Sequence, residues 1–282
     1  MTGPHREMLR PGPGARPAQD ARAPLRWAGE LLVTLGVVVL LFAGYEVVGT
    51  DWSAGAAQRG ASEELDRLWR ASAPTGAPGA AGASDGAGPG PAPVVGRPEL
   101  RMYVPALGRG WVRTVLEGVG QDVLARGPGH YPGTALPGSP GNVAIAGHRV
   151  GHGAPFDAAA DVRSCDAVVL ETRTAWFVYR VLPFAGEQAA WARTAAARPS
   201  CRGVASLAGI PGQEIVAPTA TEVIAPVPGR PGAAASASLL TVTTCNPRFS
   251  ARQRLVLHAV LVATYPKDRH GPGWRPSELA GA

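Results

Sequence analysis

A cysteine at the end of a β-branched run, Cys245, is the residue of this sequence best placed to act as a nucleophile. The run LTVTTC (residues 240–245) predicts a strand, and the following Asn246-Pro247 ends it, because proline cannot donate to a sheet ladder. A side chain delivered by the last residue of a strand is held rigidly and stays partly exposed. Because a single cysteine is more often structural than catalytic, the interpretation depends on its partners.

An arginine nine residues further on, Arg254, opens a second predicted strand (residues 254–265). If the two strands pair antiparallel, Cys245 and Arg254 come to the same end of the sheet. A guanidinium is charged at any working pH, so near a thiolate it stabilises that anion or the oxyanion of a tetrahedral intermediate. Arg248 and Arg252 are competing candidates, but they lie in the loop between the strands, whereas Arg254 is fixed by its strand neighbours.

A histidine, His148, also stands at a strand end, directly after the apolar run NVAIAG (residues 142–147). Histidine is the usual partner of a nucleophilic cysteine, because a pKa near neutrality lets it protonate a leaving amine and then deprotonate the incoming nucleophile. The other histidines lie in the tails, in the last predicted strand or in Gly-rich loops that could line a site: His5, His270, His258, His130 and His152.

The elements that must position these side chains are short β-rich runs, separated by Gly and Pro turns, over residues 97–265. This pattern predicts an all-β barrel or sandwich. A helical stretch is expected around residues 187–197, and residues 266–282 are expected to form a polar C-terminal tail with no core-forming pattern.

An apolar segment, residues 27–48, precedes the β-rich part and is about as long as a bilayer crossing requires. The arm before it (residues 1–26) is rich in arginine, Pro and Gly, so we expect it to be disordered and cytoplasmic by the positive-inside rule. A cleaved signal peptide is the alternative, but the apolar core is longer and no AxA-like site follows it. We therefore expect a single-pass anchor in the cell membrane. A stalk and a flexible Ala/Gly/Pro-rich linker (residues 49–96) would then carry an extracellular catalytic domain.

Composition excludes several classes of function. The formal charge is +6, but the basic residues are scattered and Lys267 is the only lysine, so we expect no nucleic-acid partner. The three cysteines, Cys165, Cys201 and Cys245, form no CxxC pair, and no acidic cluster suggests calcium. We therefore expect neither a metal nor an organic cofactor.

The strand-end GHR (residues 147–149), the strand-end TTC (residues 243–245) and Arg254 together resemble the sortase family. The resemblance runs from about residue 94 to residue 265. It is strongest in three stretches: HYPGTALPGSPGNVAIAGHRVGHGAPF, ETRTAWFVYRV and EVIAPVPGRPGAAASASLLTVTTCNPRFSARQRLVLHA. These stretches look like the class E sortases of actinobacteria, a housekeeping group associated with LAXTG rather than LPXTG sorting signals. The resemblance implies an eight-stranded sortase β-barrel.

The resemblance also implies a mechanism for a cysteine transpeptidase. Cys245 would attack the threonine carbonyl of the sorting signal of an exported protein and form a thioester. His148 would protonate the leaving glycine amine, and Arg254 would stabilise the oxyanion or position the substrate. An amine of a peptidoglycan precursor would resolve the thioester, which joins the protein to the cell wall without any cofactor.

Three further residues acquire a possible role from the resemblance. The tyrosine of the HYPGTA loop, Tyr131, is expected to shape the substrate pocket, and Thr243 and Thr244 lie beside the nucleophile. Loop packing for the tyrosine and strand propensity for the two threonines are the alternative interpretations.

Two features depart from the family pattern. Residues 184–210 look inserted between two strands, and this insertion carries Cys201, while Cys165 stands where relatives generally have no cysteine. We hypothesise that these two cysteines form a disulfide outside the cell and leave Cys245 as the free thiol. Two unrelated reduced cysteines are the alternative.

Other classes of cysteine enzyme fit the sequence less well. NlpC/P60 peptidases place the cysteine before the histidine, the reverse of His148 and Cys245, and L,D-transpeptidases carry a histidine and glycines around the cysteine, which TVTTCNP lacks. A pilus-polymerising sortase and a catalytically inactive, membrane-displayed β-barrel binding module are the remaining alternatives.

Overall fold

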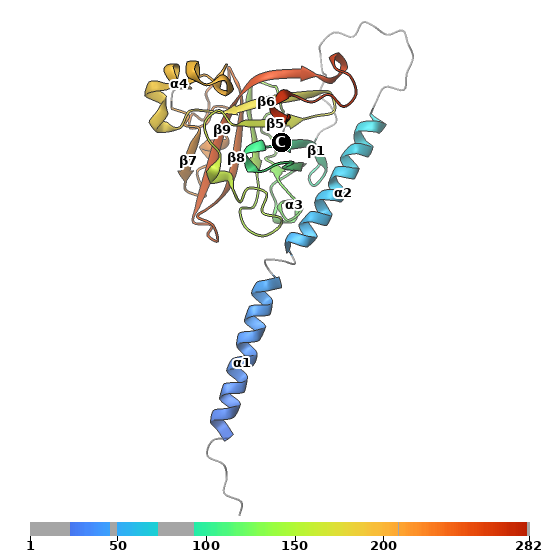
Figure 1. Ribbon diagram of the computed structural model, residues 1–282, viewed down its shortest axis with the longest axis vertical. Helices are drawn as coiled ribbons and strands as arrows, with labels where there is room; N and C mark the ends of the chain where they lie inside the picture. Colours follow the sequence, from blue (N-terminus) through green and yellow to red (C-terminus); the bar gives the residue numbers. More distant parts are fainter. Residues whose placement is uncertain (1–22, 46–49, 73–92, 208, 281–282) are drawn as a thin grey trace, which may run out of the picture. The chain divides into compact units, whose positions relative to one another are not determined.

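The computed structural model describes residues 23–45, 50–72, 93–207 and 209–280 (Figure 1). Most of the expected N-terminal arm and of the expected Ala/Gly/Pro-rich linker therefore lies outside the described residues. The chain divides into two compact units, residues 1–44 and residues 45–282.

The first unit contributes one described helix, α1 (Ala23–Gly44). Its large apolar side chains, such as Leu31, Leu40 and Phe42, are exposed. No helix in the described part of the chain is long and apolar enough to cross a membrane. The anchor expected over residues 27–48 stays a prediction.

The described part of the second unit contains nine strands, one long helix and several short ones. The strands are β1 (Pro98–Tyr103), β2 (Val112–Glu117), β3 (Gly129–His130), β4 (Gly141–Ala146), β5 (Ala167–Glu171), β6 (Ala175–Val181), β7 (Gln213–Val216), β8 (Ser238–Asn246) and β9 (Gln253–Pro266). The α-helices are α2 (Thr50–Ala71), α3 (Gln121–Leu124) and α4 (Trp191–Ala197). The 3-10 turns are η2 (Pro105–Leu107), η3 (Ala159–Asp161), η4 (Ala185–Ala190), η5 (Pro199–Cys201), η6 (Thr221–Ile224), η7 (Lys267–Arg269) and η8 (Ser277–Leu279).

Eight of the strands close into a ring in the order β6-β5-β1-β2-β3-β4-β8-β9, and the pairing of β9 with β6 completes it (Figure 1). The long strand β9 makes this closure possible, because residues 259–266 pair with β6 while residues 254–257 pair with β7. The predicted eight-stranded barrel is confirmed, with β7 as a ninth strand on the edge of β9. Alternate side chains of the ring, including Val143, Leu240 and Leu257, fill its apolar interior.

The insertion folds into η4, α4 and η5, in agreement with the expected helical stretch. Its Trp191 packs in a small apolar cluster with Leu239 of β8 and Val260 of β9, and the Trp191 indole nitrogen donates to the Val204 carbonyl at 2.8 Å. A disulfide joins Cys165 and Cys201, the pair hypothesised from the sequence, across 36 residues. The disulfide therefore attaches the insertion covalently to the segment just before β5.

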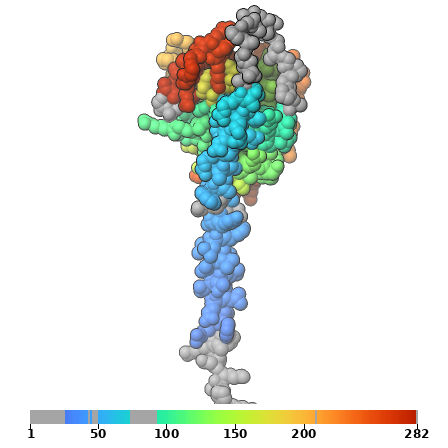
Figure 2. Space-filling view, turned by 90° about the vertical axis from the view of Figure 1, so that its right-hand side faces the viewer, coloured from blue at the N-terminus to red at the C-terminus, as the bar shows by residue number. Residues whose placement is uncertain are grey.

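A polar helix, α2, was expected to belong to a stalk, with the folded domain beginning near residue 97. The structure instead packs α2 on the barrel, where its buried Ala54, Ala61 and Leu65 form one face (Figure 2). The Gln58 amide donates to the Thr114 carbonyl at 3.0 Å and accepts from the Thr114 nitrogen at 2.9 Å. The folded unit therefore includes this helix.

The C-terminal residues differ from expectation in the same way. Trp274 stacks on His270 at 3.8 Å between ring centroids and meets Tyr265 of β9 at 5.1 Å. Glu278 forms an ion pair with Arg180 of β6 at 3.0 Å. The aromatic and charged contacts dock a segment that has no periodic apolar pattern.

Candidate active site

Three strand ends meet at one edge of the sheet. β4 runs parallel to β8, with Ala146 opposite Thr243, and β9 runs antiparallel to β8, with Arg254 directly opposite Cys245. Side chains directly opposite each other in a sheet point to the same face. Cys245 and Arg254 are therefore neighbours on one face of β8 and β9, as the sequence predicted.

That face is the outer face of the barrel. Leu240 and Val242 of β8 belong to the interior cluster, so the alternate positions Thr243 and Cys245 point outward. The parallel register of β4 and β8, continued by two residues, places His148 beside Cys245. The nucleophile thus lies between the histidine on one side and the arginine on the other.

The backbone pairing reaches as far as the residue before the histidine. The Gly147 nitrogen donates to the Thr243 carbonyl at 3.1 Å, and the Thr244 hydroxyl donates to the Gly147 carbonyl at 2.8 Å. Thr244 is buried and faces the other side of β8 from Cys245. Its place in the structure is to hold the His148 backbone rather than to contact substrate.

His148 is half-buried, and among the described residues nothing hydrogen-bonds to its Nε2 atom. Burial lowers the pKa of His148 below its ordinary value, and the nearby His152 ring, 4.7 Å away between centroids, lowers it further. The imidazole is therefore neutral at neutral pH. A neutral imidazole with a free nitrogen is able to accept a thiol proton.

Arg254 is half-exposed, and its Nη1 donates to the carbonyls of Ala251 and Gln253, each at 3.1 Å. No carboxylate in the described part of the chain forms an ion pair with it. Arg248 differs, because its guanidinium pairs with Asp157 at 2.7 Å. Of the three arginines considered from the sequence, Arg254 is thus the one directly opposite Cys245, and Arg252 lies exposed in the intervening loop.

A further arginine, Arg149, was not singled out from the sequence. It is 8% exposed, and its Nη1 donates to Asn246 Oδ1 at 2.7 Å and to the Cys245 carbonyl at 3.3 Å. It ties the loop after β4 to the end of β8 and so fixes His148 against Cys245. The sequence feature that could have indicated this role is the position of Arg149 directly after His148 in the GHR run.

Tyr131 lies on the same outer face as the nucleophile. Its hydroxyl meets the Thr243 hydroxyl at 3.0 Å, two residues before Cys245. The structure therefore brings Tyr131, Thr243, Cys245, His148 and Arg254 to one face, whereas Thr244 lies on the opposite one. This placement allows Tyr131 to border a substrate that approaches Cys245.

The loop after His148 is held by α2. Asp51 accepts a hydrogen bond from the Gly153 nitrogen at 2.8 Å, and the Thr50 hydroxyl accepts one from the His152 nitrogen at 3.3 Å. His152 has a positive φ of 51°, which a residue other than glycine adopts at a cost. The contacts from α2 help to hold the loop in that conformation.

The chain matches the family model described as "Sortase domain" over residues 102–262. The chain belongs to the sortase family. Members of this family are cysteine transpeptidases, and the order His148, Cys245, Arg254 on a closed barrel agrees with that assignment.

Two sequence relatives point to class E. The chain is 28% identical over 257 residues to sortase SrtE1 of Streptomyces coelicolor, a match that covers 88% of this chain and 60% of SrtE1. It is 28% identical over 270 residues to sortase SrtE2 of the same organism, which covers 94% of this chain and 91% of SrtE2. The match thus spans less than two thirds of SrtE1.

Two solved structures agree. The chain is similar to the SrtF sortase from Corynebacterium diphtheriae, with 35% identity, a TM-score of 0.59, and coverage of 66% of this chain and 94% of that one. It is similar to sortase E from Streptomyces avermitilis, with 35% identity, a TM-score of 0.50, and coverage of 66% and 99%. The expected class E sortase is confirmed.

Proposed function

We propose that the protein cleaves an LAXTG- or LPXTG-like sorting signal between Thr and Gly and transfers the new carboxyl end to an amine of a cell-wall peptidoglycan precursor. The observation that carries this proposal is the meeting of three strand ends, which sets Cys245 opposite Arg254 and in register with His148. A binding module has no need of this arrangement.

The chemistry follows from the state of each side chain. Neutral His148 takes the proton of the Cys245 thiol, and the thiolate attacks the threonine carbonyl. Arg254 stabilises the negative oxygen that forms. The C–N bond then breaks, the imidazolium gives its proton to the departing glycine amine, and a thioester remains. The acceptor amine attacks this thioester, loses a proton to His148 and releases the thiol.

The compartment proposed from the sequence is the outer face of the cell membrane, with α1 as part of the anchor. The disulfide between Cys165 and Cys201 supports an oxidising compartment, because such bonds rarely persist in a reducing cytoplasm. Separation of cell membranes from cytosol, followed by protease treatment of intact cells, tests this placement. Recovery of the protein in the cytosol would refute it.

The activity is tested with residues 45–282, which contain the whole second unit. Matched LAXTG and LPXTG peptides are incubated with and without a glycine-based amine, beside a Cys245→Ala control. We expect cleavage without the amine, exchange with it, and neither in the control.

The same assay separates the alternatives. A lysine-containing peptide as the preferred acceptor would indicate a pilus polymerase. A folded protein that alkylates at Cys245 but processes neither peptide would refute transpeptidation and leave a binding module.

A further inference from the structure

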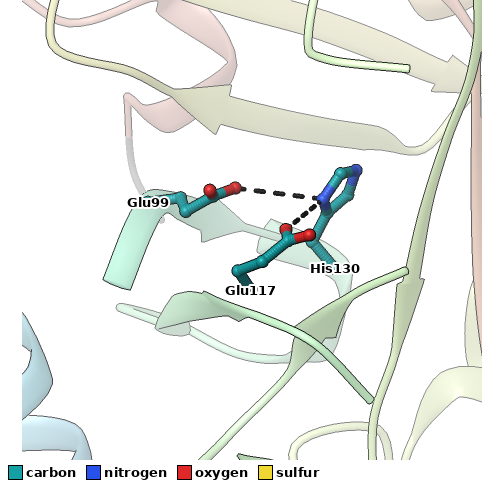
Figure 3. A group of neighbouring side chains, drawn as sticks. All are labelled: Glu99, Glu117 and His130. Carbon is teal, nitrogen blue, oxygen red and sulfur yellow. Dashed lines mark hydrogen bonds and ion pairs between the residues drawn. The ribbon is translucent and has the colours of Figure 1, made fainter. Parts of the chain in front are cut away.

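A buried histidine, His130, lies at the end of β3 and is 2% exposed. Its Nδ1 atom lies 2.7 Å from Glu117 Oε2 and 3.9 Å from Glu99 Oε2. Figure 3 shows the two carboxylates pointing at the same ring nitrogen, one from β1 and one from β2. One side of the imidazole therefore faces only hydrogen-bond acceptors.

The other side of the ring faces the loop that carries Tyr131. His130 Nε2 lies 3.2 Å from the Ala135 carbonyl and 2.9 Å from the Thr134 hydroxyl. The carbonyl can only accept, and the Thr134 hydroxyl donates to the Tyr131 carbonyl at 2.8 Å. The ring is thus bonded to Glu117 of β2 through Nδ1 and to residues 134 and 135 of the loop through Nε2, so it connects that strand to the loop.

We propose that His130, held in place by its hydrogen bond to Glu117, is a positioning residue that fixes the loop of residues 130–135 so that Tyr131 borders the Cys245 face. The inference rests on the proposed function, since the substrate groove is that of a transpeptidase. Neither His130 nor Glu117 touches the reacting atoms.

The hydrogen bonds of the loop show how the ring acts on Tyr131. The Tyr131 nitrogen donates to the Ala144 carbonyl of β4 at 2.9 Å, and the Tyr131 hydroxyl meets Thr243 of β8 at 3.0 Å. Between these points the loop contains Pro132 and Gly133 and leaves the sheet. The contacts from His130 to residues 134 and 135 hold the end of the loop next to its start. The loop therefore folds around the His130 ring.

A metal ion is the alternative occupant, because the ligand atoms of Glu99, Glu117 and His130 all lie within 4.8 Å of one another. Two ligands bound to zinc at about 2.0–2.2 Å stand more than about 3 Å apart in a tetrahedral site. The 2.7 Å between His130 Nδ1 and Glu117 Oε2 is a hydrogen-bond distance instead. The geometry favours a shared proton.

The second carboxylate adds a dependence on pH. Burial, followed by the neighbouring Glu117, raises the pKa of Glu99 to about 7, while His130 and Arg97 oppose the rise. Below pH 7 Glu99 is protonated and donates to Glu117. Above it, Glu99 is an anion beside Glu117, and the repulsion between the two carboxylates disturbs the hydrogen bond that holds His130.

The test uses the full chain and measures kcat and KM for the sorting-signal peptide between pH 6 and pH 9. We expect His130→Gln to raise KM about tenfold with kcat within about twofold of the wild type. In the wild type KM should rise as pH passes 7, and in Glu99→Gln it should not. Unchanged KM in a folded His130→Gln variant would overturn the proposal.

The matched control is His258→Gln. His258 is also a buried strand histidine, bonded to Glu214 at 2.9 Å and to Thr241 at 2.9 Å. Its loss should lower the melting temperature without the rise in KM. An equal rise in KM in both variants would show that His130 acts only through the stability of the fold, and it would overturn the proposed positioning role.

Two measurements do not depend on turnover. Nitrogen NMR of the imidazole rings should show His130 signals that do not change on adding Zn²⁺, and a shift of these signals with Zn²⁺ would overturn the proposal even if His130→Gln failed to fold. Calorimetry of peptide binding to Cys245→Ala, with and without His130→Gln, should show about tenfold weaker binding in the double variant. If the wild type binds peptide but does not process it, the proposed function fails while this inference stands.

Discussion

Thr244→Val is the most informative single change, because it removes one hydroxyl at nearly constant volume. The Thr244 hydroxyl is buried and donates to the Gly147 carbonyl at 2.8 Å. Valine leaves that carbonyl without its donor, which costs about 1–3 kcal/mol. For a domain of this size the melting temperature should fall by roughly 2–4 °C per kcal/mol.

The catalytic effect is expected to exceed that of a simple loss of stability. Gly147 immediately precedes His148, so a shift of its peptide moves the imidazole relative to Cys245. Misplacement of a catalytic group by about 1 Å costs up to about a hundredfold in rate. We expect kcat of Thr244→Val to fall by about tenfold or more, with KM nearly unchanged.

The assay compares Thr244→Val with Thr243→Val, its neighbour on the opposite face of β8. The Thr243 hydroxyl meets Tyr131 at 3.0 Å, so its loss should act on KM rather than on kcat. Steady-state kinetics with the peptide and thermal unfolding are measured on both variants. If the two variants change kcat and KM in the same proportion, the assignment of the two faces is refuted.

Three further outcomes are expected. Arg254→Lys should lower kcat/KM by about a hundredfold, because an ammonium group does not reproduce the paired donors of the guanidinium. Arg252→Lys should leave kcat/KM unchanged. Equal losses in the two variants would refute the choice of Arg254. A thiol count on denatured, unreduced protein should give one reactive thiol, Cys245, and three thiols would rule the disulfide out. Reducing the disulfide, which closes a loop of 36 residues, should lower the free energy of unfolding by about 4 kcal/mol on the loop-entropy model. The raised pKa of Glu99 favours the folded state below its ordinary value of 4.5, and this contribution is lost as pH rises through about 7. Glu99→Gln should therefore match the wild type near pH 5 and exceed its unfolding free energy by up to about 3 kcal/mol at pH 8.5; the same difference at both pH values would contradict this account.

The meeting of Cys245, His148 and Arg254 was predictable because its signals are local in the sequence. Cys245 and His148 each follow a β-rich run and precede a break, and Arg254 begins the next strand. A side chain at the end of a strand is held in place by the sheet and stays partly exposed to solvent, and the sequence alone shows where a strand ends. The barrel was predictable for a related reason, since short apolar runs between Gly and Pro turns must pair with one another.

The remaining features depend on contacts between distant segments. The α2 helix was expected to be a stalk, because its buried residues are mostly alanines and its adhesion relies on the Gln58 amide. Arg149 lies directly after His148, but only the fold shows that it reaches Asn246. The pairing of Glu117 with His130 across 13 residues likewise follows from the order of the strands in the sheet, and residue types alone do not predict that order.

The docking of α2 changes what the Ala/Gly/Pro-rich segment of residues 73–92 can do. Both of its ends belong to the same folded unit, one at the end of α2 and the other before β1. An insertion in this segment is therefore an insertion within one folded unit rather than between two, and a longer connection between points that are already held together costs little stability.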